Sequence, residues 1–291
     1  MRHPDPTLRR FETAFAARRR RRVAGWVLGL GTLAVLAVWA ADISRFTIDR
    51  LARGLPRIGD YIWLTLPDLS VGDFLADVAF WFYDFPRWLG LLLDTFLIAL
   101  LATGVGGVIA AGLSFVASRN LVSSYGLYFV TRRALEIMRT VPEVVYALIF
   151  VVAFGVGPLA GLLAITIHTI GALGKLFAEV NENVDPAPME GVRACGGGWL
   201  TEMRFAVWPQ VASGFAAYLL WRLELNIRAA AIIGFVGAGG IGQELYTAIS
   251  MNYYEDISAM VLMIVLTVTL IDLTSERLRH RLIGRAAFEK V

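Results

Sequence analysis

Cysteine is nearly absent from this chain, and charged residues are scarce. Cys195 is the only cysteine among 291 residues, so no intrachain disulfide can form and no multi-cysteine metal site is possible. Asp, Glu, Lys and Arg make up 18% of the residues, whereas about a quarter is usual in a soluble domain. Together with 57% hydrophobic residues and a mean hydropathy of +0.62, this scarcity predicts an integral membrane protein.

Several chemical motifs are also missing. The chain has no G-x-x-x-x-G-K-[ST] loop, so it cannot cradle ATP phosphates in the usual way, and energy from ATP must come from a partner. It shows no paired catalytic carboxylates, no histidine-rich metal set and no nucleophile motif. We therefore expect neither an enzyme nor a cofactor or metal bound by this chain.

The order of polar and apolar segments predicts an all-α membrane protein of about six transmembrane helices. A basic segment, 1–23, ends in the run Arg18 to Arg22 and precedes an apolar segment, 24–42, of about the minimum length that crosses a bilayer. A basic run there is typical of a cytoplasmic anchor rather than a nucleic-acid site. The long polar start and the later spans favour a retained helix over a signal peptide.

Residues 43–87 differ in character, because six aspartates recur among tryptophans and phenylalanines. This pattern predicts short amphipathic helices on the outer face of the membrane, although four arginines between Arg45 and Arg57 are unusual there. A permease core is expected over 88–276, followed by a basic tail, 277–291. Six spans and two basic ends predict that both termini are cytoplasmic. The core spans are expected at 88–117, 141–156, 159–180, 211–236 and 257–273.

One polar stretch, Glu190 to Pro209, interrupts the apolar core within a loop at 182–209. Its sequence, EGVRACGGGWLTEMRFAVWP, predicts a short helix, a tight turn and a proline that opens the next span. The spacing resembles the EAA loop of ABC importer permeases, which is Glu-Ala-Ala, three residues, Gly, nine residues, Ile-x-Leu-Pro. Glu190, Gly196 and Pro209 match in register. The two alanines are replaced by Gly191 and Val192, and the Ile and Leu by Ala206 and Trp208.

A longer resemblance covers about Arg139 to Glu244, which is similar to the permease subunit of phosphonate ABC importers. Three segments carry it: RTVPEVVYALIFVVAFGVGPLAG, IHTIGALGKLFAEVNENVDPAPMEGVRA and RLELNIRAAAIIGFVGAGGIG. The resemblance implies a type I ABC importer permease in the bacterial inner membrane, forming a homodimer with its pore on the two-fold axis.

It further implies partners that do the remaining work. Two ATPase subunits, which bind ATP and Mg, would dock on the loop, and a periplasmic or lipid-anchored binding protein would deliver phosphonate, phosphite or phosphate. No nucleic-acid partner is implied. The docking residues would be Glu190, Gly191, Arg193, Ala194, Gly196 and Pro209.

Ionisable residues inside the spans are candidates for a translocation path or gate, because they are costly in lipid and usually face protein or water. In RLELNIR, Glu224 and Arg228 share one helical face as an i,i+4 pair, and Asn226 lies on nearly the opposite face with Arg222. Arg228 suits an oxyanion, since a guanidinium offers paired donors. An alternative for Glu224 and Arg228 is a structural ion pair.

His168 and Lys175, seven residues apart, are candidates for a polar stripe that meets an anion. The alternatives are a hydrogen-bonded packing histidine and a lysine that reaches the lipid headgroups. Glu143, next to the helix-bending Pro142, is a candidate gate residue or ion-pair partner.

Residues 237–242, GAGGIG, fit the dinucleotide pattern G-x-G-x-x-G, but no strand precedes them and they follow a span. We interpret them as a turn at the outer mouth that supports a gate or the docking of the binding protein. It would use positive φ angles and close backbone contacts at Gly237, Gly239, Gly240 and Gly242.

The alternative function is a proton-driven secondary transporter of small anions in which His168, Glu143 and Glu224 relay protons. No inverted repeat is visible, which argues against it. A membrane-embedded enzyme has no motif in its favour.

Overall fold

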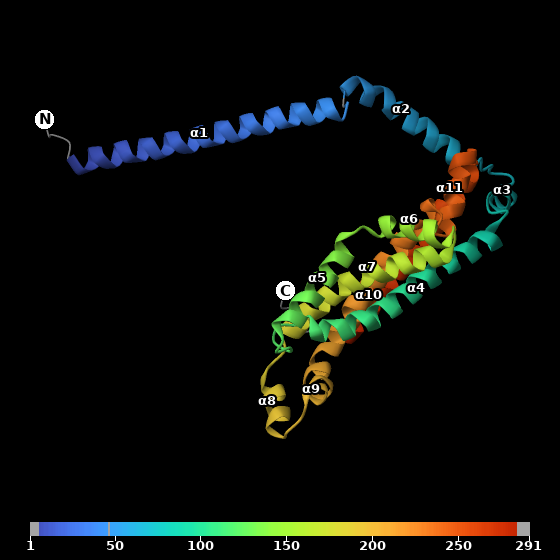
Figure 1. Ribbon diagram of the computed structural model, residues 1–291. Helices are drawn as coiled ribbons and strands as arrows, with labels where there is room; N and C mark the ends of the chain where they lie inside the picture. Colours follow the sequence, from blue (N-terminus) through green and yellow to red (C-terminus); the bar gives the residue numbers. More distant parts are fainter. Residues whose placement is uncertain (1–5, 46, 284–291) are drawn as a thin grey trace. The chain divides into compact units, whose positions relative to one another are not determined.

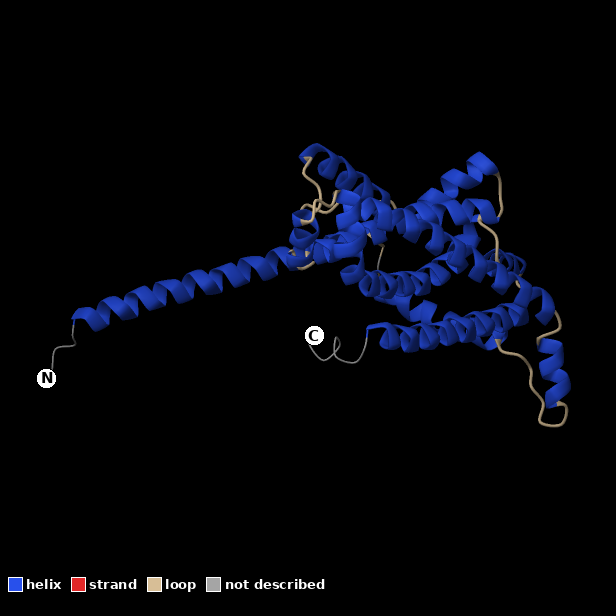
Figure 2. Ribbon diagram, turned by 90° about the horizontal axis from the view of Figure 1, so that it is seen from below, coloured by secondary structure: helices blue, strands red, loops and turns tan. Residues whose placement is uncertain are grey.

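The computed structural model describes residues 6–45 and 47–283, and this part of the chain consists of helices and connecting loops (Figure 2). The all-α prediction is confirmed. The chain divides into two compact units, Met1–Trp63 and Leu64–Val291.

The first unit contains α1 (Pro6–Ile43) and most of α2 (Ile48–Thr65). Helix α1 continues from the arginine run into the apolar segment, so among the described residues no structural boundary separates the basic segment from 24–42. Its part from Arg18 to Ile43 is long and apolar enough to cross a membrane. In α2, apolar residues recur every three or four positions from Ile48 to Ile62, and three arginines lie on the opposite side, which makes the helix amphipathic.

The second unit opens with a short loop and α3 (Phe74–Trp81). The backbone N–H and the hydroxyl of Ser70 both donate to the Asp77 carboxylate, each at 2.7 Å. These two hydrogen bonds favour the ionised carboxylate and hold the pKa of Asp77 below the usual 3.8. Asp77 therefore folds the loop back onto α3.

Span-length helices make up most of the second unit. Helices α4 (Phe85–Val116), α7 (Pro158–Glu182) and α12 (Tyr254–Ile283) each pass as single spans. With α1 these make four candidate spans in the described part, or up to six when two bent helix pairs are each counted as one. The second bent pair consists of the helical stretch Trp199–Val236, which contains α10 (Trp208–Ile233), and α11 (Ile241–Met251), and the two meet at 45°.

The first bent pair departs from the sequence expectation of one helix bent at Pro142. Helices α5 (Tyr125–Thr140) and α6 (Glu143–Phe154) are separate and lie at 85° to each other. Pro142 has no N–H to donate and disfavours helical geometry at Val141, which is extended. The break is therefore local and complete.

Helix α7 is central to the second unit, because it contacts α4, α5, α6 and α10 (Figure 1). Two glycines permit these contacts. A Cβ on Gly106 of α4 would lie 2.9 Å from the Thr169 side chain, and one on Gly171 of α7 would lie 2.6 Å from the Arg139 nitrogen. Other glycines of α4 are not in such contact, since a Cβ on Gly104 or Gly112 would meet open space.

Helix α12 extends past the expected end of the sixth span at Leu273 and runs to Ile283. The first residues of the expected basic tail are therefore helical. The remainder of that tail, from 284, lies outside the described residues.

Candidate functional site

The polar stretch between α7 and α10 forms a helical hairpin, which we call the α8–α9 hairpin, residues 187–202. Helix α8 (Ala187–Ala194) is followed by a glycine turn and by α9 (Trp199–Glu202). Gly196 has a φ of 79°, in the region that glycine adopts most readily. A single π-helical turn (Met203–Val207) then leads into α10, in which Pro209 is the second residue.

An ion pair closes this hairpin. Arg193 donates to both carboxylate oxygens of Glu202, over 2.9 and 2.6 Å, and the Glu202 side chain is 5% exposed. Hydrogen bonding to Glu202 raises the pKa of Arg193, so the arginine stays charged. The sequence identified Arg193 but missed Glu202, because a spacing of nine residues is not a regular helical contact. Glu202 directly precedes the π turn, so the pair joins α8 to the start of α10.

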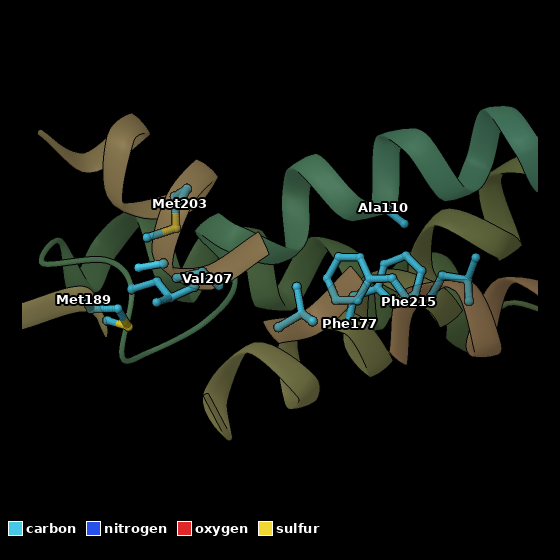
Figure 3. Close-up of a cluster of buried hydrophobic side chains, with 10 residues drawn as sticks. Ala110, Phe177, Met189, Met203, Val207 and Phe215 are labelled. Atoms are coloured by element: carbon cyan, nitrogen blue, oxygen red, sulfur yellow. The ribbon is translucent and has the colours of Figure 1, made fainter. Parts of the chain in front are cut away.

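Apolar packing fixes the hairpin to the end of the bundle. Met189 of α8 is 4% exposed and belongs to a buried cluster with Met203 and Val207. The same cluster continues to Phe177 of α7 and Phe215 of α10, whose rings stack with centroids 3.9 Å apart (Figure 3). Burial of Met189 leaves the opposite side of α8 exposed.

Two polar contacts add to this packing. The Trp199 indole N–H donates to the Leu121 carbonyl at 2.8 Å, which ties α9 to the turn after α4. Gln210 of α10 accepts from the Asp185 N–H at 2.9 Å, just before α8. The hairpin is thus held at its entry and at its exit. The predicted docking residues that remain exposed on it are Glu190, Gly191, Ala194 and Gly196, with Arg193 partly so.

The charged residues of α10 separate onto two faces as the helical spacing predicted. Glu224 and Arg228 form an ion pair, and Arg228 also lies 3.3 Å from Asp272 of α12. Arg279 of α12 lies 3.4 Å from the second Glu224 oxygen. These four residues form a charge network between α10 and α12. Asp272 was not among the predicted path residues, although it is an ionisable group in an expected span, and Arg279 was expected in the tail.

On the other face, Asn226 is fully buried and donates to the hydroxyls of Thr103 and Thr169, both at 2.8 Å. This amide joins α10 to α4 and α7. In this structure it is therefore a packing residue and is closed to solvent.

His168 and Lys175 have different partners in α7 and its neighbours. Lys175 lies 3.4 Å from Glu179, one turn along the same helix. The His168 ring instead joins Glu143 and Arg222, with Nδ1 at 3.2 Å from Glu143 Oε2 and at 2.6 Å from Arg222 Nη2. The structure therefore brings two predicted gate residues, His168 and Glu143, together with Arg222. The spacing of residues along the sequence did not predict the contact between Arg222 and His168.

The glycine turn after α10 has the geometry that the sequence predicted. Gly237, Gly239 and Gly240 have φ angles of 86°, 83° and 73°, and a Cβ on Gly242 would lie 1.8 Å from the Ala231 carbonyl. The Gly157 N–H donates to the Gly237 carbonyl at 2.9 Å, which links this turn to the one before α7. The segment between the expected spans 211–236 and 257–273 thus holds both this turn and α11.

No group of three or more His, Cys, Asp or Glu side chains in the described residues could hold a metal ion. The described site consists of a helical hairpin at one end of a bundle of span-length helices and of charged side chains that pair between those helices. These features are typical of a transmembrane subunit of a transport system.

The chain belongs to the family described as "Binding-protein-dependent transport system inner membrane component", whose model matches residues 106–287. It is a permease subunit of an ABC importer, in which ATP hydrolysis belongs to the partner ATPase.

Relatives agree with this assignment. The chain is 36% identical over 261 residues to the phosphite transport system permease protein PtxC of Stutzerimonas stutzeri, covering 88% of this chain and 90% of PtxC. It is 35% identical over 201 residues to the phosphate-import permease protein PhnE of Mycolicibacterium smegmatis, covering 69% and 38%. It is 43% identical over 122 residues to the "putative cryptic phosphonate transport system permease protein PhnE2" of Escherichia coli, covering 42% and 100%.

Solved structures share the fold. A chain of a bacterial ABC transporter that imports the acidic polysaccharide alginate aligns with a TM-score of 0.59 and 14% identity, over 91% of this chain and 99% of that one. A chain of the MetNI methionine ABC transporter aligns with a TM-score of 0.58 and 18% identity, over 67% and 95%. The type I ABC importer architecture is therefore confirmed.

Proposed function

We propose that this chain translocates a small phosphorus oxyanion, namely phosphonate, phosphite or phosphate, as a homodimer in the bacterial inner membrane. The names of the relatives support this substrate class. The charge network supports it chemically, because the guanidinium of Arg228 presents paired donors that match two oxygens of a phosphorus oxyanion.

The observation that carries the proposal is the exposure of this charge network on helices that cross the membrane. The side chains of Arg228 and Asp272 are 42% and 40% exposed. Charges at membrane depth face protein or water rather than lipid. A second copy of the chain, placed against this face, would enclose the network around a shared aqueous path.

Within that path, Arg228 is the residue that meets the substrate. Its guanidinium lies between Glu224 and Asp272, so an incoming oxyanion must compete with two carboxylates. This competition keeps binding weak, and weak binding allows the substrate to leave. Glu224 is in turn close to Arg279, which leaves the network of two arginines and two carboxylates without net charge.

Coupling to ATP hydrolysis would occur at the α8–α9 hairpin. Two ATPase subunits would dock against Glu190, Gly191, Arg193, Ala194 and Gly196, with Pro209 starting the span that receives the movement. The hairpin and the glycine turn lie at opposite ends of α10, whose 26 residues rise about 39 Å. We therefore place the binding protein at the glycine turn, and both termini on the side of the ATPases.

The test uses the complete complex, with its ATPase and binding protein, in proteoliposomes loaded with ATP. Uptake of labelled phosphonate, phosphite and phosphate is measured for the wild type, Arg228→Ala and Arg228→Lys. A hydrogen bond to a charged group contributes about 1.5–3 kcal/mol, so its loss in Arg228→Ala should lower the rate of uptake by about tenfold or more. Arg228→Lys, which keeps the charge but loses the paired donors, should fall between the two.

Arg57→Ala is the matched control, since it removes an arginine that lies before the family-matched region. Uptake that is unchanged in both Arg228 variants would exclude Arg228 from the path. Uptake of none of the three oxyanions by an assembled complex would reject the substrate class. Uptake that needs no ATPase but stops when the proton gradient is removed would favour the secondary transporter instead.

A further inference from the structure

Three transmembrane helices bring an acid, a base and a cation together away from the charge network. Glu143 is the first residue of α6, His168 is in the middle of α7 and Arg222 is in α10, and these three helices contact one another (Figure 1). Arg222 is 9% exposed, and its Nε is buried without a hydrogen-bond partner. A buried guanidinium with so few partners depends strongly on those that it has.

The partners of the imidazole determine where its proton lies. Nε2 is 3.1 Å from the Arg139 carbonyl, which can only accept, so Nε2 carries a hydrogen. Nδ1 is 2.6 Å from Arg222 Nη2, which can only donate, so Nδ1 is bare and the ring is neutral. The same Nδ1 is 3.2 Å from Glu143 Oε2, and a carboxylate also accepts. One ring nitrogen thus faces a donor and an acceptor, and it can serve only one of them at a time.

We propose that His168 is a protonation-controlled latch that joins α7 to α10 when neutral and to α6 when protonated, with Arg222 and Glu143 as its positioning residues. In the neutral state Arg222 donates to Nδ1. Uptake of one proton from water at Nδ1 turns that nitrogen into a donor, which then pairs with the Glu143 carboxylate. Arg222 loses its acceptor and faces a second cation, so it moves away from the ring.

Close packing between α7 and α5 restricts the change of hydrogen-bond partner to one side of the His168 ring. Gly171, one turn after His168, lies so near α5 that a Cβ would be 2.6 Å from the Arg139 nitrogen. This approach keeps Nε2 at the Arg139 carbonyl in both states. Only Nδ1 changes its hydrogen-bond partner, so the change alters the contacts of α7 with α6 and with α10.

The charged groups that face the ring are Glu143 from α6 and Arg222 from α10. Helix α5 contributes the Arg139 carbonyl, and Lys175 of α7 is paired with Glu179. On α4, Asp94 lines a cavity with Pro158 and Leu159, at the start of α7, well before His168. The latch therefore depends on one acid and one arginine.

Two measurements test the latch, and the first does not depend on transport. The full chain, labelled with ¹⁵N-histidine, is placed in lipid nanodiscs, and the His168 signals are assigned by comparison with His168→Gln. The expected spectrum shows a hydrogen on Nε2 and a bare Nδ1 at pH 8, and a doubly protonated ring after acidification. A ring that keeps one protonation state from pH 8 to pH 5 would overturn the proposal.

The second measurement rests on the proposed function. Uptake by the assembled complex is measured from pH 8 to pH 5 for the wild type, His168→Gln, Glu143→Ala and Arg222→Lys. Dividing each wild-type rate by the His168→Gln rate removes the effect of substrate ionisation. We expect the ratio of the wild-type rate to the His168→Gln rate to change several-fold with pH. The ratio of the Glu143→Ala rate to the His168→Gln rate should stay constant. Arg222→Lys, which keeps a donor, should retain the pH dependence of the wild type.

A constant wild-type ratio in a complex that transports would refute the latch. A complex that takes up none of the oxyanions, while His168 exchanges protons as described, would reject the proposed substrate and leave the latch intact.

Discussion

Burial of Met189 is the main apolar contact of α8 with the bundle, and its removal has a calculable effect. Met189→Ala deletes a side chain that is 4% exposed and lies in a cluster with Met203 and Val207. Buried Met→Ala substitutions cost about 2–5 kcal/mol, from lost transfer energy and the remaining cavity. Even the lower value corresponds to an opening equilibrium about 30-fold more favourable.

Hydrogen–deuterium exchange of the chain in nanodiscs measures this opening directly. Opening of α8 exposes the Met189 side chain to water in the wild type, and Met189→Ala removes this cost. Peptides covering α8 should therefore exchange at least about 30-fold faster in the variant. Binding of the ATPase subunits should weaken in parallel, because they would have to order the hairpin on docking.

Two control variants separate packing from other effects. Met189→Leu roughly conserves volume and should cost less than about 1.5 kcal/mol, which is little more than tenfold. Leu200→Ala removes a side chain of the same hairpin that is 75% exposed, and exchange should change by no more than about twofold. Unchanged exchange of α8 in Met189→Ala would refute the conclusion that this methionine anchors the hairpin.

Three further predictions follow from the packing, the ion pair and the loop before α3. Gly171→Ala would force its Cβ against the α5 backbone and should cost about 1–3 kcal/mol, seen as a lower melting temperature in detergent, whereas Gly104→Ala, with open space, should not change it. Arg193→Ala and Glu202→Ala should each speed exchange in α8, and the double variant should be no worse than the Glu202 variant, because both remove the same contact; additive effects would argue against the pair. The pKa of Asp77 is lowered in the folded chain, so its hydrogen bonds with Ser70 stabilise the loop above the usual pKa of 3.8, and this stabilisation is lost as pH falls through the lowered pKa. Hydrogen exchange of the loop should show a step over that pH range, and Asp77→Asn should abolish the step. A step that persists in Asp77→Asn would assign the titration to another group.

Sequence patterns predicted an all-α chain with span-length helices and the faces of α10, and the structure shows why. Span length depends on local composition, and an i,i+4 spacing fixes which side chains share a helical face, as for Glu224 and Arg228. The positive φ angles of the glycine turn were predictable because few other residues tolerate them.

Contacts between helices were harder to predict. Whether Arg222 meets His168 depends on the rotation of α7 against α10, which no local pattern encodes, and the same is true of Arg193 with Glu202. The separation of α5 from α6 was underestimated, because a proline in an apolar segment usually bends a helix, whereas here the chain turns by 85°.

The break between α5 and α6 creates a need for hydrogen-bond donors inside the membrane. Helix α6 has 12 residues and rises about 18 Å, well short of the roughly 30 Å of a hydrocarbon core, so a joint within the span leaves carbonyl groups at membrane depth. Two side chains cap them: the Tyr146 hydroxyl donates to the Met138 carbonyl at 3.3 Å, and the His168 ring donates to that of Arg139. Unpaired carbonyls would be too costly in hydrocarbon for such a joint to persist. A tyrosine and a histidine thus supply the hydrogen bonds that an unbroken helix would have made for itself.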